Sequence, residues 1–157
     1  MKKLSNETNL LLERRYKEAA LLSLLLIAIV TILLSGVLFF ELPAIPVDGS
    51  DVNSLWVGVI FLAVGALLVR RVRNRWDVIK DIFLLKGLEG VFVKLKMDSF
   101  LVSLFGVGVG ILGAIIFLAT ESVGDLLRSS FVTVVAFAVG FPRKKIWRRI
   151  ASELEGR

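Results

Sequence analysis

Long apolar runs alternate with polar segments along the whole chain of 157 residues. The runs 19–40 and 99–120 each hold 22 residues without an acidic or basic side chain, whereas 55–69 and 126–141 are shorter. A helix of 22 residues rises roughly 33 Å, which is enough to cross a hydrocarbon core about 30 Å thick. The pattern predicts an all-α integral membrane protein in which four transmembrane helices form two helical hairpins.

The polar segments divide this single membrane domain into five parts. We expect an N-terminal arm (1–18), a first hairpin (19–69), a basic linker (70–98), a second hairpin (99–141) and a tail (142–157). Ser5 or Asn6 is the expected N-cap of a helix that runs from the arm into the first span. Pro43 and Pro46 prevent a continuous helix through the first turn, and Pro142 ends the fourth helix.

Two shorter stretches have the spacing of amphipathic helices. Trp76 and Ile79 begin one apolar face in the linker, and Trp147 begins another in the tail. This spacing predicts two short helices that lie in the membrane interface with Trp at headgroup depth, the first of them ended by Gly87 and Gly90. For residues 91–97 we favour a helix over a strand, because a strand would have no partner.

Basic residues gather on one side of the predicted membrane. Of the 20 Lys and Arg residues, 19 fall in the arm, the linker and the tail, and one, Arg128, falls on the other side. Nine acidic residues accompany the basic segments, and five lie in the two turns that contain Glu41 and Glu121. Because basic residues in short flanking segments remain cytoplasmic, we expect a multi-pass protein of the cell membrane with both termini in the cytoplasm.

The two halves of the chain resemble one another weakly. An offset of 80 residues places Ser23 on Ser103, and an offset of 71 places Trp76 on Trp147. Since each half contains an even number of crossings, a duplication would be parallel rather than inverted. Duplication and a chance similarity of apolar segments are both open at this point.

Small residues at helical spacing mark the expected contacts between helices. In membranes such residues let two helix backbones approach closely. Two of them lie one heptad apart in the second span, and the others form a ridge along the third. The predicted helix-packing residues are Gly58, Gly65, Gly106, Gly110, Gly113 and Ala114.

Several kinds of chemistry are excluded by composition. The chain has no Cys and no His, so it has no disulfide, no thiolate or imidazole metal ligand and no imidazole base. The interiors of the four spans also lack ionisable side chains, which disfavours an ion-coupled pump. We predict no catalytic residue, no metal and no cofactor, and hence a protein that is not an enzyme. In the outer turns, Glu41 and Glu121 with Arg128 form a candidate ion pair.

Clusters of basic residues follow the second and fourth spans. Such juxtamembrane clusters attract anionic headgroups with about 1 kcal/mol per charge. Positive-inside bias alone explains the net charge of +6, so we expect membrane lipids as ligands and no nucleic acid. The predicted anionic-lipid-binding residues are Arg70, Arg71, Arg73, Arg75, Arg143, Lys144 and Lys145.

Two functions are consistent with this pattern. The first is a non-enzymatic interaction or assembly subunit. It would bind a membrane protein partner or form a small homo-oligomer packed through its glycine faces. The alternative is a small transporter or channel for a neutral or lipid-like substrate. Its lining would be Ala28, Thr31 and Ser35 of the first span with Ser129 and Thr133 of the fourth. A transporter predicts a wet cavity that reaches mid-bilayer, whereas an interaction subunit predicts a closed bundle with an apolar lateral face.

Overall fold

The computed structural model describes residues 4–40 and 43–155, and within these ranges it contains helices and no strand. Four helical stretches are long and apolar enough to cross a membrane, as the hydropathy pattern predicts. The helices are α1 (Asn6–Phe39), α2 (Gly49–Arg73), α3 (Trp76–Thr120), α4 (Val123–Gly140) and α5 (Lys144–Glu155). The all-α prediction is therefore confirmed for the part of the chain that the structure describes.

The helix starts follow local capping chemistry. Ser5 caps α1 as predicted, because its hydroxyl accepts the backbone N–H of Thr8 at 3.2 Å. In the same way the hydroxyl of Ser122 accepts the backbone N–H of Asp125 at 3.3 Å, so α4 begins earlier than the apolar run does. Only Glu121, in a left-handed conformation with φ 53°, and Ser122 separate α3 from α4. After this short link α4 packs directly against α3.

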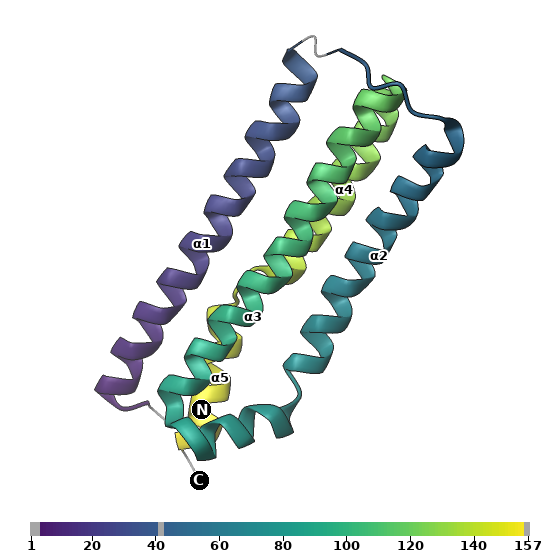
Figure 1. The fold of residues 1–157 in the computed structure, drawn as a ribbon. Coiled ribbons are helices and arrows are strands. Elements are labelled where there is room, and N and C mark those ends of the chain that lie inside the picture. Colours follow the sequence, from purple (N-terminus) through teal and green to yellow (C-terminus); the bar gives the residue numbers. More distant parts are fainter. Residues whose placement is uncertain (1–3, 41–42, 156–157) are drawn as a thin grey trace.

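Helix α3 is the centre of the bundle, and α1, α2 and α4 all pack on it. Figure 1 shows α3 standing between α1 and α2, with α4 behind it. Among the described residues, α1 and α2 make no contact with each other. The two helices of the first predicted hairpin therefore lie on α3 and not on each other. The described part of their connection contacts α3, where the Ile45 N–H donates to the carbonyl of Leu118 at 3.0 Å.

The central position of α3 follows from its glycines, which face three different neighbours. A Cβ added at Gly106 would lie 3.3 Å from the ring of Phe137 in α4, and one at Gly113 would clash with Ser129, which is also in α4. Gly110 lies against Val30 of α1. Without a Cβ at these positions, backbones of three helices approach one another closely.

The other predicted packing residues lie at the same contacts. In α2, a Cβ at Gly58 would lie 3.1 Å from Leu112, and one at Gly65 would lie 3.1 Å from Phe105, both in α3. Ala114 is buried within α3. All six predicted residues therefore lie at or beside contacts within one copy of the chain, which leaves none of these glycine faces free for a second copy.

The serines that the offset of 80 aligns lie next to each other. The hydroxyls of Ser23 in α1 and Ser103 in α3 are 3.3 Å apart, and both residues are buried. If the two halves of the chain were related by an internal symmetry axis, equivalent residues of α1 and α3 would meet at that axis in this way. Duplication nevertheless stays a prediction.

A sharp bend divides α3 into two arms at Gly87. This residue has φ 63° and ψ −167°, a conformation that favours glycine, and the chain changes direction there. The short arm, 76–86, lies across the lower end of the bundle in Figure 1, and the long arm rises through its centre. The predicted break at Gly87 is confirmed, whereas Gly90 lies within the long arm and does not end the helix. Residues 91–97 are helical as expected.

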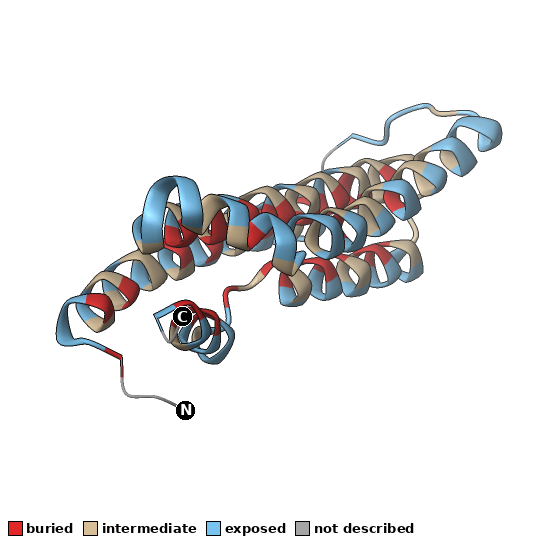
Figure 2. Cartoon of the chain, turned by 90° about the horizontal axis from the view of Figure 1, so that it is seen from below, coloured by how far each residue is buried: buried red, intermediate tan, exposed pale blue. Residues whose placement is uncertain are grey.

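One end of the bundle, which we call the basic end, is formed by residues 4–18, 70–98 and 142–155 and carries both described chain ends. It has its own apolar core, and Figure 2 shows this end from below with its buried residues in red. Trp147 has an exposed fraction of only 3%. Its ring lies edge-on to Tyr16 at 6.0 Å and stacks on Phe92 at 6.2 Å between centroids.

The apolar face of α5 therefore packs on the protein and not on an interface, which corrects the prediction for the tail. The physical reason is that α1 extends unbroken into the N-terminal arm. Its first turns, together with α3, supply the surface that α5 covers. The same correction holds for most of the predicted apolar face of the linker arm. Ile79 is buried and Trp76 and Phe83 pack against the same core, whereas Leu84 and Leu85 have exposed fractions of 80 and 81%.

Two carboxylates attach α5 to the arm, and their titration predicts a pH-dependent contact. A hydrogen bond from Lys144 lowers the pKa of Glu13, and one from the Thr8 hydroxyl lowers the pKa of Glu155. A carboxylate whose pKa is lower in the folded than in the unfolded state stabilises the fold at pH values above its unfolded pKa, here 4.5. This contribution is lost as the pH falls through the folded-state pKa. We expect the protection factors of the α5 amides, which are corrected for the intrinsic pH dependence of exchange, to be lower at about pH 4 than at about pH 7.

The substitution Glu155→Gln should reduce this pH dependence, since a neutral amide does not titrate. The matched control is Glu153→Gln, whose carboxylate pairs with Arg149 inside α5 at 2.9 Å. Equal pH profiles for the two variants would contradict the attachment.

Candidate anion-binding site at the basic end

A cavity of about 330 Å³ lies where α2 and α4 end and α5 begins, with α3 as its remaining wall. Three arginines line it, together with the amide of Asn74, the hydroxyl of Ser99 and the carboxylate of Asp98. The rest of its wall is mainly apolar, including Val102, Val139 and Trp147. Its volume is at the lower end of the range for ligand cavities, about 300–1,000 Å³. The lining arginines are Arg70, Arg71 and Arg143.

The helix ends determine where these arginines lie. Arg70 and Arg71 are in the last turn of α2, where a cation stabilises the negative end of the helix dipole. Arg143 stands between α4 and the first residue of α5, so the positive end of the α5 dipole borders the same cavity. Local helix chemistry thus brings cationic side chains to this level of the bundle.

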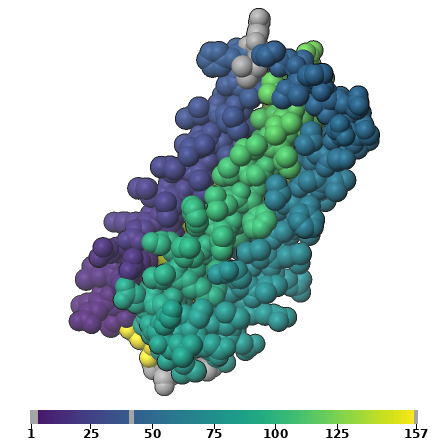
Figure 3. Space-filling view, in the orientation of Figure 1, coloured from purple at the N-terminus to yellow at the C-terminus, as the bar shows by residue number. Residues whose placement is uncertain are grey.

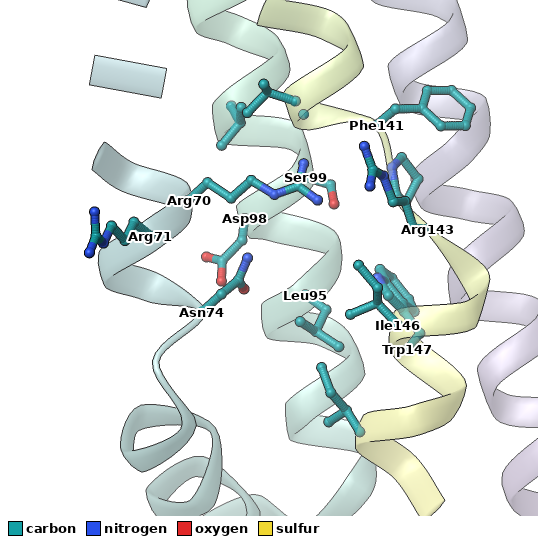
Figure 4. Close-up of a pocket in the computed structure, with 15 residues that line it drawn as sticks. Arg70, Arg71, Asn74, Leu95, Asp98, Ser99, Phe141, Arg143, Ile146 and Trp147 are labelled. Atoms are coloured by element: carbon teal, nitrogen blue, oxygen red, sulfur yellow. The ribbon is translucent and has the colours of Figure 1, made fainter. Parts of the chain in front are cut away.

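Figure 4 shows that the side chains do not share one direction. Arg70 reaches from α2 toward Ser99 of α3, whereas the neighbouring Arg71 points away from the cavity. Arg143 lies on the opposite side, on the segment that leads into α5. Arg70 and Arg143 are therefore the two cations that border the interior, and Arg71 belongs to the rim.

The acid of the cavity, Asp98, is already bound by two cations. Arg73 Nε lies 2.5 Å from Asp98 Oδ1, and the Lys94 ammonium contacts the other carboxylate oxygen and the Arg73 carbonyl. The Asp98 and Lys94 side chains have exposed fractions of 4% and 7%. This triad joins the C-terminal end of α2 to the long arm of α3. Its two cations, Arg73 and Lys94, neutralise the charge of Asp98.

Among the described residues the cavity arginines have no counter-ion, unlike several other cations of the basic end. Arg15 pairs with Glu89 at 2.7 Å and Lys96 with Glu18 at 2.9 Å, and Lys144 pairs with Glu13. For Arg70, Arg71 and Arg143, no carboxylate within residues 4–40 and 43–155 lies within 4.0 Å. The cavity therefore presents positive charge that the described part of the protein does not neutralise.

The predicted lipid-binding set separates into three groups. Arg70, Arg71 and Arg143 line the cavity, Arg73 and Lys144 are held in ion pairs, and Arg75 and Lys145 are exposed. The sequence-based prediction missed Asp98, Asn74 and Ser99. Of these three residues only Asp98 had a signal in the sequence, namely its position four residues after Lys94, which allows an ion pair on one helix face.

The remaining predicted residues lie elsewhere. The predicted pairing of Arg128 with Glu121 is wrong, because Arg128 pairs with Asp125, one turn away, at 3.5 Å. Glu41, the other predicted partner, is outside the described residues. Thr31 and Ser35 are exposed on α1, whereas the hydroxyls of Ser129 and Thr133 are buried and donate to backbone carbonyls of α4. The structure does not bring these four hydroxyls together into one polar path.

A second, more open cavity of about 690 Å³ lies inside the bend of α3. Its walls combine apolar side chains such as Val93 and Met97 with Lys86 and Glu89. Neither cavity is lined by a residue from the half of the bundle that is opposite the basic end.

No family model matches this chain, and no curated protein or solved structure is significantly similar to it.

Proposed function

We propose that this protein is a non-enzymatic, multi-pass membrane protein that acts as an interaction or assembly subunit and holds anionic lipid headgroups at its cytoplasmic face. The supporting observation is the distribution of exposed side chains. Leu21, Phe61 and Phe131, from three different helices, have exposed fractions of 64, 75 and 71%. Exposed apolar surface on this scale is unfavourable in water and favourable in lipid, while the ion pairs gather mainly at the basic end.

The proposed topology is testable because the chain contains no Cys, so a single introduced cysteine is labelled unambiguously. We expect Asp48→Cys to react with a membrane-impermeant maleimide from outside intact cells. Lys145→Cys should react only after permeabilisation, because the basic end faces the cytoplasm. Reaction of both variants from the same side would refute the topology.

The apolar lateral face between α1 and α2 is the surface that best supports an interaction role. Val93, Met97, Leu104 and Ile111 of α3 are exposed and recur with helical spacing. Figure 3 shows α3 visible along this face between its two neighbours. Because the glycine faces are occupied within one copy, a second copy or a partner helix would pack here.

Disulfide crosslinking in the membrane tests this face. Oxidation of the Leu104→Cys variant should give a discrete dimer if a second copy packs on the face. The control Phe131→Cys lies on the exposed side of α4 and should remain monomeric. Equal crosslinking of both variants, or of neither in a chain that is monomeric by native mass spectrometry, would refute self-assembly through this face.

A further inference from the structure

We infer that the cavity between α2, α3, α4 and α5 binds a lipid headgroup that ends in a phosphomonoester. The inference rests on the proposed membrane location and adds the chemical class of the ligand. It starts from Arg70 and Arg143, which border the cavity from two sides without a carboxylate partner among the described residues.

The charge of the cavity favours a doubly charged group. A phosphomonoester carries about −1.5 to −2 charges at pH 7 and presents three acceptor oxygens. A phosphodiester carries about one negative charge. Guanidinium groups bind phosphate oxygens in bidentate fashion, and two of them facing one cavity therefore match a terminal phosphate best. Asp98 does not oppose this binding, because Arg73 and Lys94 neutralise it.

The walls of the cavity explain why the ligand is a lipid. Asn74 and Ser99 provide neutral donors beside the arginines, whereas Val102, Val139 and Ile146 form an apolar wall. Val102 and Val139 belong to α3 and α4, which lead from the cavity into the apolar bundle. A ligand with a phosphate at one end and acyl chains at the other thus meets a matching surface along its length.

Soluble short-chain lipids test the inference with purified protein in detergent. Dioctanoyl phosphatidate should raise the midpoint of thermal unfolding more than dioctanoyl phosphatidylglycerol, and dioctanoyl phosphatidylcholine should give no shift. Inorganic phosphate at the same concentration should give a much smaller shift. A full shift with inorganic phosphate alone would assign the cavity to a free anion and overturn the lipid assignment.

The variants separate the cavity from general surface charge. The double variant Arg70→Gln/Arg143→Gln should weaken phosphatidate binding by about tenfold for each guanidinium removed. The matched control is Lys17→Gln/Arg75→Gln, which loses the same charge at two exposed positions outside the cavity and should keep the preference for phosphatidate. Equal weakening in both double variants, or equal binding of phosphatidate and phosphatidylglycerol by the unmodified protein, would overturn the site.

A conservative variant covers the case in which the double variant does not fold. Arg70→Lys keeps the charge but loses the planar fork, so we expect weaker phosphatidate binding with an unchanged unfolding midpoint in the absence of lipid. Full phosphatidate affinity in this variant would contradict a bidentate role for Arg70. Cysteine labelling at Asp48 and Lys145 does not depend on any of these residues, so failure of the lipid site and failure of the topology are distinguishable.

Discussion

Replacing Asp98 with Leu is expected to lower the free energy of unfolding by about 3–5 kcal/mol. The change leaves the Lys94 ammonium almost fully buried without its counter-ion, and it removes the group that holds Arg73. A buried charge without a partner is far more costly than the loss of an exposed ion pair, which contributes only about 0.2–1 kcal/mol. Reversible unfolding in mixed micelles by increasing the fraction of a denaturing detergent measures the difference.

Two further variants separate loss of a partner from loss of packing. The double variant Asp98→Leu/Lys94→Met replaces the ion pair with apolar side chains of similar size, and we expect it to recover most of the lost stability. Glu89→Gln breaks the exposed contact with Arg15 and should cost less than about 1 kcal/mol. If the double variant is as unstable as Asp98→Leu alone, burial of Lys94 is not the cause.

The apolar helices are the part of the fold that the sequence pattern predicts well. Length and hydropathy determine each long helix locally, without reference to a neighbour. The Ser5 cap and the bend at Gly87 are also local, because each depends on the conformation or hydrogen bonding of a single residue. Properties of this kind are visible in one stretch of chain at a time.

The order of the helices in space is not visible in this way. Gly58 and Gly65 indicate close packing but do not identify the partner helix, which is α3 and not α1. Trp147 has the spacing expected for an interfacial residue, yet Tyr16 and Phe92 bury it. An amphipathic face shows that a surface is needed, and only the tertiary fold determines whether protein or lipid supplies it.

The candidate site depends on contacts that are distant in sequence. Arg73 and Asp98 are 25 residues apart and come from two helices, so their pairing requires the turn between α2 and α3 to be known. Arg143 approaches the same cavity from the other half of the chain. The basic clusters predicted an anionic ligand in general, whereas a specific cavity required three helix ends to meet.

The substitution Gly113→Leu is expected to destabilise the bundle by about 3 kcal/mol, because the α3–α4 contact has no room for a side chain. A Cβ at this position would lie 2.6 Å from the Cβ of Ser129, whose own hydroxyl is fixed by the Leu126 carbonyl at 3.0 Å. The helices must separate or bend to accept the side chain. Mixed-micelle unfolding again measures the loss.

Gly36→Leu is the matched control for this substitution. A Cβ there would meet only the side chain of Phe40, the C-cap residue of the same helix, at 3.9 Å. Leu is a better helix former than Gly by roughly 0.5–1 kcal/mol, so Gly36→Leu should be neutral or stabilising. The contact itself is tested by a double-mutant cycle with Gly113→Ala and Ser129→Gly. Because removing the Ser129 side chain makes room for the new methyl group, the two changes should compensate each other by about 0.5–3 kcal/mol. Strict additivity would mean that the instability of Gly113 variants does not arise at the α3–α4 contact.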